Sequence, residues 1–194
     1  MNQQGTDKEL VRKVLDGDDQ AYRTLVERYQ HMVYTLGVRM LGDPELAEET
    51  SQDVFVKAYT ALGTFRGAAK FSTWLYKIAY HRLLDAADRE RRRRSWQGDP
   101  GKEQLNRPAA EDTWSGLMAE ERRYWLLQAL DALEPEDRDI LSLHYLQQQS
   151  IKEVAVITGL RAGTVKVRLH RARERLRTHL EASATGKILQ NYER

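Results

Sequence analysis

The side chains best suited to chemistry lie between Phe65 and Arg82, where aromatic rings alternate with cations. The rings and cations of this run are Phe65, Arg66, Lys70, Phe71, Trp74, Tyr76, Lys77, Tyr80, His81 and Arg82. Rings stack on unpaired bases and cations neutralise phosphates, so this mixture is typical of a surface for single-stranded nucleic acid or a flipped base. The alternative is that Phe71, Trp74 and Tyr80 are simply core residues. We favour a core position for Trp74, and nucleic-acid contact for the loop 65–70 and for His81.

A second stretch, Ser150 to Arg177, has the pattern of a helix, a tight turn and a second helix. Ser150 with Glu153 predicts a capping box, Gly159 suits a helix end, and Thr164 is predicted to cap the second helix. An apolar stripe at helical spacing then comprises Val165, Leu169, Ala172 and Leu176, and the residues facing away from it are Lys166, Val167, His170, Arg171 and Glu174. Eight basic and two acidic residues give this stretch a charge of +6. The pattern predicts a helix-turn-helix whose second helix enters the DNA major groove; a helical hairpin with a basic solvated face is the alternative.

The third candidate is acidic. Residues 43–53 hold five acids and no base, and Glu45 and Glu49 are spaced to form a carboxylate pair for acid–base work or a metal. No histidine lies nearby, and the chain contains no glycine-rich phosphate loop and no HExxH. We therefore favour a docking face for a basic protein over an enzyme, and expect no catalytic residue, no cofactor and no metal.

We expect an all-α fold, in which helices position these candidate residues. Helices are predicted over 7–16, from 18 or 19 to Gly42, over 44–62, and from Thr73 to 94, with 64–72 as a loop. No stretch alternates with a period of two for long enough to be a strand. We predict a first domain over 1–94, a flexible acidic linker over 95–118 and a second helical domain over 119–194.

The second domain is expected to begin with a helix that ends at Glu134. Pro135 starts the next helix, with Ile140, Leu141, Leu143 and Leu146 as its buried side, and the helix-turn-helix follows. The tail from Ala182 is small and polar and is expected to fray.

Composition narrows the class of protein. The net charge is only +2, yet residues 66–94 carry +6 and residues 95–121 carry −4, which indicates more than one kind of partner. The absence of cysteine excludes disulfides and thiolate zinc sites. No apolar run approaches the roughly 20 residues of a membrane span, and the polar N-terminus is unlike a secretory signal. We expect a cytoplasmic protein with no direct membrane insertion.

Two anchors carry a resemblance to a known family. The first is AEETSQDVFVKAYTAL followed by TFRGAAKFSTWLYKIAYHRLLD, and the second is SIKEVAVITGLRAGTVKVRLHRARERLR. In this order, with an acidic segment between them, they resemble a bacterial RNA polymerase sigma factor of the extracytoplasmic-function (ECF, group 4) type of the sigma-70 family. The resemblance covers nearly all of residues 7–180.

The resemblance implies roles by position. Helix 44–60 resembles the segment that binds the clamp helices of the largest polymerase subunit, with Glu49, Gln52 and Asp53 as contacts. Recognition and melting of the minus-ten element fall to Phe65, Arg66, Ala69, Lys70, Phe71 and His81. Recognition of the minus-thirty-five element falls to Arg161, Thr164, Lys166, Val167, Arg168, His170, Arg171 and Arg175.

The resemblance also implies partners. These are core RNA polymerase, promoter DNA as duplex and as non-template single strand, and an anti-sigma factor that holds the chain inactive, at the inner membrane in some cases, until a stress or envelope signal arrives. No small-molecule substrate is implied. Three departures bear on promoter preference: His81 stands where asparagine is frequent in the family, Val167 stands where serine is common, and the loop Arg66–Lys70 lacks an acidic residue that is often present there.

Two other interpretations stay open on sequence alone. One is a helix-turn-helix regulator that binds duplex without core polymerase and uses its first domain to sense a ligand or dimerise. The other is an inactive paralogue or a decoy that binds an anti-sigma factor.

Overall fold

The computed structural model describes residues 5–96, 126, 128–130 and 132–192, with side chains described as far as residue 182. The chain divides into two units, residues 1–108 and 109–194, and the division falls inside the segment predicted as a linker. That segment lies outside the described residues except for its first two positions, which are helical. All regular structure in the described residues is helical, as predicted.

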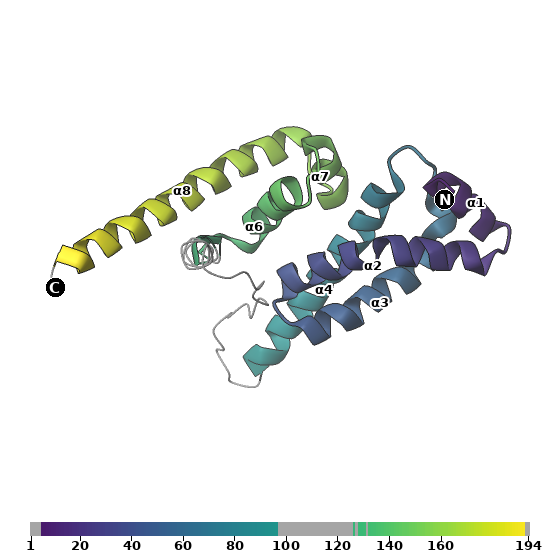
Figure 1. Cartoon of the computed structure of the whole chain (residues 1–194), viewed down its shortest axis with the longest axis horizontal. Helices are drawn as coiled ribbons and strands as arrows, with labels where there is room; N and C mark the ends of the chain where they lie inside the picture. Colours follow the sequence, from purple (N-terminus) through teal and green to yellow (C-terminus); the bar gives the residue numbers. More distant parts are fainter. Residues whose placement is uncertain (1–4, 97–125, 127, 131, 193–194) are drawn as a thin grey trace, which may run out of the picture. The chain divides into compact units, whose positions relative to one another are not determined.

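The described part of unit 1, residues 5–96, contains four helices and one short turn of 3₁₀ helix (Figure 1). They are α1 (Asp7–Leu15), α2 (Asp19–Leu41), α3 (Pro44–Ala61), η1 (Leu62–Thr64) and α4 (Phe71–Trp96). Side chains cap the starts of three helices: Thr6 and Glu9 form a capping box, and the carboxylates of Asp18 and Asp43 accept from the first free N–H groups of α2 and α3. Gly42 ends α2 in the left-handed conformation.

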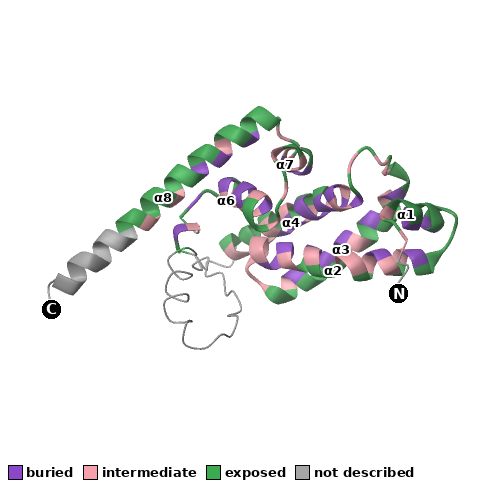
Figure 2. Cartoon of the chain, turned by 45° about the horizontal axis from the view of Figure 1, so that its top comes forward, coloured by how far each residue is buried: buried purple, intermediate pink, exposed green. Residues whose placement is uncertain are grey.

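The core of unit 1 lies where α2, α3 and α4 meet, and Figure 2 shows buried residues along their facing sides. Val33, Val54, Leu75 and Leu83 are fully buried there. Gly37 allows α2 to approach its neighbours closely. A Cβ at this position would lie 3.2 Å from the Cβ of Ala47 and 3.4 Å from Cδ2 of Leu83, so a larger side chain would separate the three helices.

Unit 2 is helical from Pro135 to Tyr192 apart from its turns, and Ala129 and Leu133 before it are buried. Its elements are α6 (Pro135–Leu141), a π-helical turn η2 (Ser142–Leu146), α7 (Ile151–Thr158) and α8 (Ala162–Tyr192). Ser150 and Glu153 form the predicted capping box, and Gly159 ends α7 with a φ of 74°. The predicted stripe of α8 is confirmed for Val165, Leu169 and Ala172, which are buried, whereas Leu176 is half-buried.

Several predictions from the sequence were wrong in detail. Helix α4 starts at Phe71, two residues early, because the carbonyl of Lys70 already accepts from the N–H of Trp74. Leu146 is 53% exposed rather than buried, since the π-helical turn rotates it away from the side that Ile140 and Leu143 bury. The tail from Ala182 continues α8 to Tyr192. Its alanine, lysine, leucine and glutamine residues are good helix formers, and these outweigh the single glycine.

Candidate nucleic-acid interface

The loop 65–70 is held at both ends by aromatic rings. Phe65 contacts Phe71 and Trp74 with ring centroids 5.5 and 5.6 Å apart, and Phe71 also packs on Tyr29 of α2 at 5.5 Å. Below the loop, the hydroxyl of Thr64 donates to the carbonyl of Ala61 over 2.7 Å. Both ends of the loop are thus fixed to the helical core, whereas Arg66, Ala68 and Lys70 are exposed.

The structure corrects one residue of the predicted minus-ten set. Phe71 is only 3% exposed and lies within the ring cluster, so we assign it to the core of unit 1 and not to a surface that a base can reach. Phe65 and Ala69 are half-buried, and His81 is exposed on α4 one turn beyond Lys77. Trp74, which we expected in the core, is half-buried.

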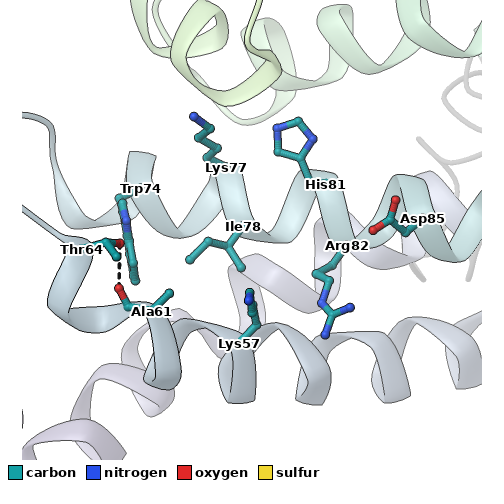
Figure 3. Close-up of a pocket in the computed structure, with 9 residues that line it drawn as sticks. All are labelled: Lys57, Ala61, Thr64, Trp74, Lys77, Ile78, His81, Arg82 and Asp85. Atoms are coloured by element: carbon teal, nitrogen blue, oxygen red, sulfur yellow. Dashed lines mark hydrogen bonds between the residues drawn. The ribbon is translucent and has the colours of Figure 1, made fainter.

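A groove of about 520 Å³ lies between the end of α3 and the outer face of α4 (Figure 3). Lys57 and Ala61 of α3 and Thr64 of η1 form one wall, and the other is formed by Trp74, Lys77, Ile78, His81, Arg82 and Asp85. The lining includes three Lys/Arg side chains and one carboxylate, and the Trp74 ring supplies an aromatic surface. The groove therefore combines a cationic lining with a stacking platform, the two features that single-stranded nucleic acid requires.

The groove includes residues that the sequence analysis did not place at the site. Lys77 and Arg82 belong to the aromatic and cationic run but were not among the predicted contacts, and Lys57 and Thr64 were missed. The spacing of 57, 61 and 64 puts them on one helical face, but nothing in the sequence shows that this face meets α4. The Nε of Arg82 is buried and, within the described residues, has no hydrogen-bond partner.

The first three turns of α3 present an acidic stripe to solvent. We define it as Glu45, Glu48, Glu49, Gln52 and Asp53, all exposed, and it continues into Val56, which is 67% exposed. The other side of α3 is buried through Ala47, Val54 and Ala58. The stripe offers negative charge beside an exposed apolar side chain, which suits a protein surface carrying lysine and arginine.

Helix α8 presents the predicted basic face. Arg161, Thr164, Lys166, His170 and Arg171 are exposed, and Val167 is 50% exposed. Thr164 does not cap the helix, because α8 begins at Ala162 and the carbonyl of Arg161 already accepts from the N–H of Val165. Thr164 is therefore an exposed residue of the first turn, at the end of the helix that helix-turn-helix proteins direct toward base edges.

Two arginines of the predicted set are engaged by acids of α6. Arg168 Nη1 donates to Glu136 over 2.6 Å, and Arg175 Nη1 donates to Asp137 over 3.0 Å. Asp137 is 8% exposed, so this second pair joins α6 to α8 at the edge of the core. Lys166 and Arg171 have no such carboxylate partner within the described residues. The cations of α8 thus differ in how available they are to a phosphate.

Comparison with known proteins agrees with this architecture. Residues 25–93 match the family model for sigma-70 region 2, and residues 123–176 match that for sigma-70 region 4. The ECF RNA polymerase sigma-E factor of Escherichia coli is 33% identical over 186 residues, covering 90% of this chain and 94% of the relative. The RNA polymerase sigma-H factor of Pseudomonas aeruginosa is 31% identical over 182 residues, covering 88% and 92%.

Solved structures share the fold. CnrH, solved in complex with the cytosolic domain of CnrY, matches with a TM-score of 0.65 at 24% identity, over 92% of this chain and 99% of that one. RpoE of Bartonella quintana, solved with the anti-sigma factor NepR, matches with a TM-score of 0.64 at 21% identity, over 82% and 96%.

The two matched regions, in this order on one chain, define a promoter-specificity factor of bacterial RNA polymerase. The chain belongs to the ECF group of the sigma-70 family. The family model for region 2 covers all of α3, the groove and α4 as far as residue 93, and that for region 4 covers the helix-turn-helix. No helix in the described part of the chain is long and apolar enough to cross a membrane.

Proposed function

We propose that this sigma factor divides its work among three surfaces. The acidic stripe of α3 binds the clamp helices of core RNA polymerase, through Glu49, Gln52 and Asp53. Loop 65–70 and the adjoining groove hold the non-template strand of the minus-ten element as it melts. The exposed face of α8 reads the minus-thirty-five element as duplex. The protein has no catalysis of its own and acts by positioning the polymerase.

The observation that carries this proposal is the segregation of charge along α3 and α4. The N-terminal half of α3 is acidic and exposed, and its C-terminal half contributes Lys57 to a groove that also holds Lys77 and Arg82. One small unit thus offers an acidic face to a protein and a basic, aromatic face to a nucleic acid. A regulator acting on duplex alone would need the helix-turn-helix and would have no use for the groove.

Melting needs a site that stabilises an unpaired base. Flipping a base out of a duplex costs a few kcal/mol in lost stacking and pairing, and stacking on an aromatic side chain recovers ~1–3 kcal/mol per base. Half-buried Phe65 and Trp74 provide rings, and Arg66, Lys70 and Lys77 provide charge for the adjacent phosphates. His81, exposed on the same helix, is placed to hydrogen-bond a base, and its identity sets the minus-ten preference.

On α8 the hydrogen-bonding contacts to base edges come from Lys166, His170 and Arg171, and Val167 offers an apolar contact to a thymine methyl. Arg161, Thr164, Arg168 and Arg175 contact phosphates. Val167 has no hydrogen-bonding group, so the preferred base at its position is set by shape and not by a donor or acceptor.

An anti-sigma factor covers the polymerase-binding surfaces until a stress or envelope signal releases the chain. Two fold neighbours support this proposal. RpoE was solved with the anti-sigma factor NepR, and CnrH was solved with the cytosolic domain of CnrY. The chain acts in the cytoplasm, at the inner membrane when such a partner is anchored there.

The test is run-off transcription with core polymerase on a pool of randomised promoters, with and without the chain. Transcripts that require the chain and share two spaced motifs are expected. Gln52→Ala with Asp53→Ala should abolish association with core polymerase, whereas Glu27→Gln, an exposed acid on α2, should not. Tight duplex binding without any polymerase association or transcript would refute the proposal and favour the polymerase-independent regulator.

A further inference from the structure

Helix α1 is clamped to α2 at its first residue. The carboxylate of Asp7 pairs with the guanidinium of Arg28 and accepts from the hydroxyl of Tyr29 over 2.5 Å. Arg28 also donates to the carbonyl of Gly5 over 3.1 Å. Burial, and then the hydrogen bond to Asp7, raise the pKa of Tyr29, so this hydroxyl stays protonated as a donor. The first turn of α1 therefore has a fixed position relative to the rest of unit 1.

The clamp places α1 against the loop 65–70. The ring of Tyr29 packs on Phe71, which closes one end of the loop, and α1 contacts η1 at the other end. Gly67, at the loop's turn, has a φ of +69°. The Cε and Nζ of Lys8 lie 3.6 and 3.9 Å from the position that a Cβ of Gly67 would occupy, so the lysine side chain runs along the loop backbone.

The charge of Lys8 is not neutralised by its neighbours in sequence. Asp7 is engaged by Arg28 and Tyr29, and the carboxylate of Glu9 accepts from the backbone N–H of Thr6 over 2.8 Å. The pKa of Glu9 is lowered first by these bonds to Thr6 and only secondarily by the charges of Lys13 and Arg12. Lys8 is exposed and has no carboxylate partner among the described residues.

We propose that Lys8 contacts a phosphodiester of the non-template strand beside the base held by loop 65–70, so that α1 is part of the promoter-melting surface. This inference rests on the proposed function of the loop. A lysine is suited to the role, because its compact charge on a flexible stem needs no bidentate geometry to bind a phosphate. A cation that reaches over Gly67 can contact the backbone of a strand whose base is held by the loop 65–70.

The test measures binding of the complex with core polymerase to a single-stranded non-template oligonucleotide that carries the minus-ten element. Lys8→Ala should weaken binding about two- to tenfold at low salt and make the salt dependence shallower by about 0.7 in log–log slope, the value for one phosphate on a single strand. Lys8→Arg should keep the wild-type slope. Lys13→Ala is the matched control, because Lys13 is an exposed lysine on the same helix, about a turn and a half along α1 from Lys8. A duplex that holds only the minus-thirty-five element should bind all four proteins equally.

A second measurement separates contact from support of the loop. Each phosphate of the oligonucleotide is replaced in turn by a neutral methylphosphonate. Wild type should lose affinity at the phosphate that Lys8 contacts, and Lys8→Ala should lose nothing further at that one position. Equal losses by both proteins at every phosphate, or a Lys8→Ala slope equal to that of Lys13→Ala, would overturn the inference. If the wild-type protein bound no oligonucleotide and supported no transcription, the proposed function itself would be refuted. If the wild-type protein bound normally and Lys8→Ala had no effect, only the inference about Lys8 would be refuted.

Discussion

Glu136 offers a direct test of whether Arg168 is a phosphate contact. Its carboxylate lies 2.6 Å from Arg168 Nη1, and the two side chains are 67% and 32% exposed. If Arg168 turns to a phosphate, this pair must break. Glu136→Gln should therefore strengthen binding to a duplex that holds the minus-thirty-five element.

The size of the gain follows from the exposure of the pair. An ion pair at the surface contributes ~0.2–1 kcal/mol, which corresponds to about a 1.4- to 5-fold increase in affinity when it no longer competes. Each phosphate contact on duplex DNA contributes about 0.9 to the log–log salt slope. If Arg168 makes its contact fully only once Glu136 is neutral, the slope of the variant should be steeper by up to that amount.

The assay is competition binding of the complex with core polymerase over a range of salt concentrations. Glu181→Gln is the matched control, because Glu181 pairs with Arg177 over 2.7 Å on α8 and neither residue is a proposed contact. Glu181→Gln changes the net charge by the same amount as Glu136→Gln. An equal gain in DNA affinity for both variants would therefore reflect only the change in overall charge. A Glu136→Gln variant with unchanged or weaker affinity, or one that behaves like Glu181→Gln, would refute the assignment of Arg168.

Three further outcomes are expected. Lys57→Ala should weaken binding to the non-template oligonucleotide and leave binding of core polymerase and of the minus-thirty-five duplex unchanged; equal weakening on both DNAs would contradict the assignment of the groove. Gly37→Leu should lower the melting temperature, because the added side chain overlaps Ala47 and an overpacked core costs ~1–3 kcal/mol, and a wild-type melting temperature would show that α2 can move aside. Hydrogen bonds from Arg93 and then Arg94 lower the pKa of Glu90 to about 2, so the stabilisation by this cluster should be complete above pH ~4.5, the ordinary value, and be lost as pH falls toward 2; an NMR titration of Glu90 with a midpoint near 4.5 would contradict it.

The elements of this fold were predictable because their ends are marked by local chemistry. Thr6, Asp18, Asp43 and Ser150 each satisfy free N–H groups within three residues, so a cap is visible in a short stretch of sequence. The errors arose where no such mark exists. The first hydrogen bond of α8 is accepted by the backbone carbonyl of Arg161, and no side chain in the sequence marks that position.

The residues of the groove that lie on α4 were visible in the sequence, whereas those contributed by α3 were not. Trp74, Lys77 and His81 follow α4 at intervals that the sequence displays. Lys57 joins them only because α3 packs against α4, a long-range contact with no local signal. The same limit explains Phe71, whose ring has the composition of a base-stacking residue and the surroundings of a core residue. Only the positions of Tyr29, Phe65 and Trp74 around it decide between the two.

The distribution of charge argues that DNA binding by this protein depends on the polymerase. The whole chain carries only +2, and Glu136 and Asp137 engage two arginines of the DNA-binding helix. The proposed DNA-binding face of α8 is therefore weakened by the acids close to it, and phosphate contacts supply most of the affinity for non-specific DNA. When core polymerase holds both surfaces over one promoter, the second contact becomes intramolecular and its effective concentration rises to the millimolar range. At a promoter with both elements, modest affinity of each surface for its element is then enough for stable binding. DNA with only one element gains nothing from the linkage, and neither does the chain without core polymerase.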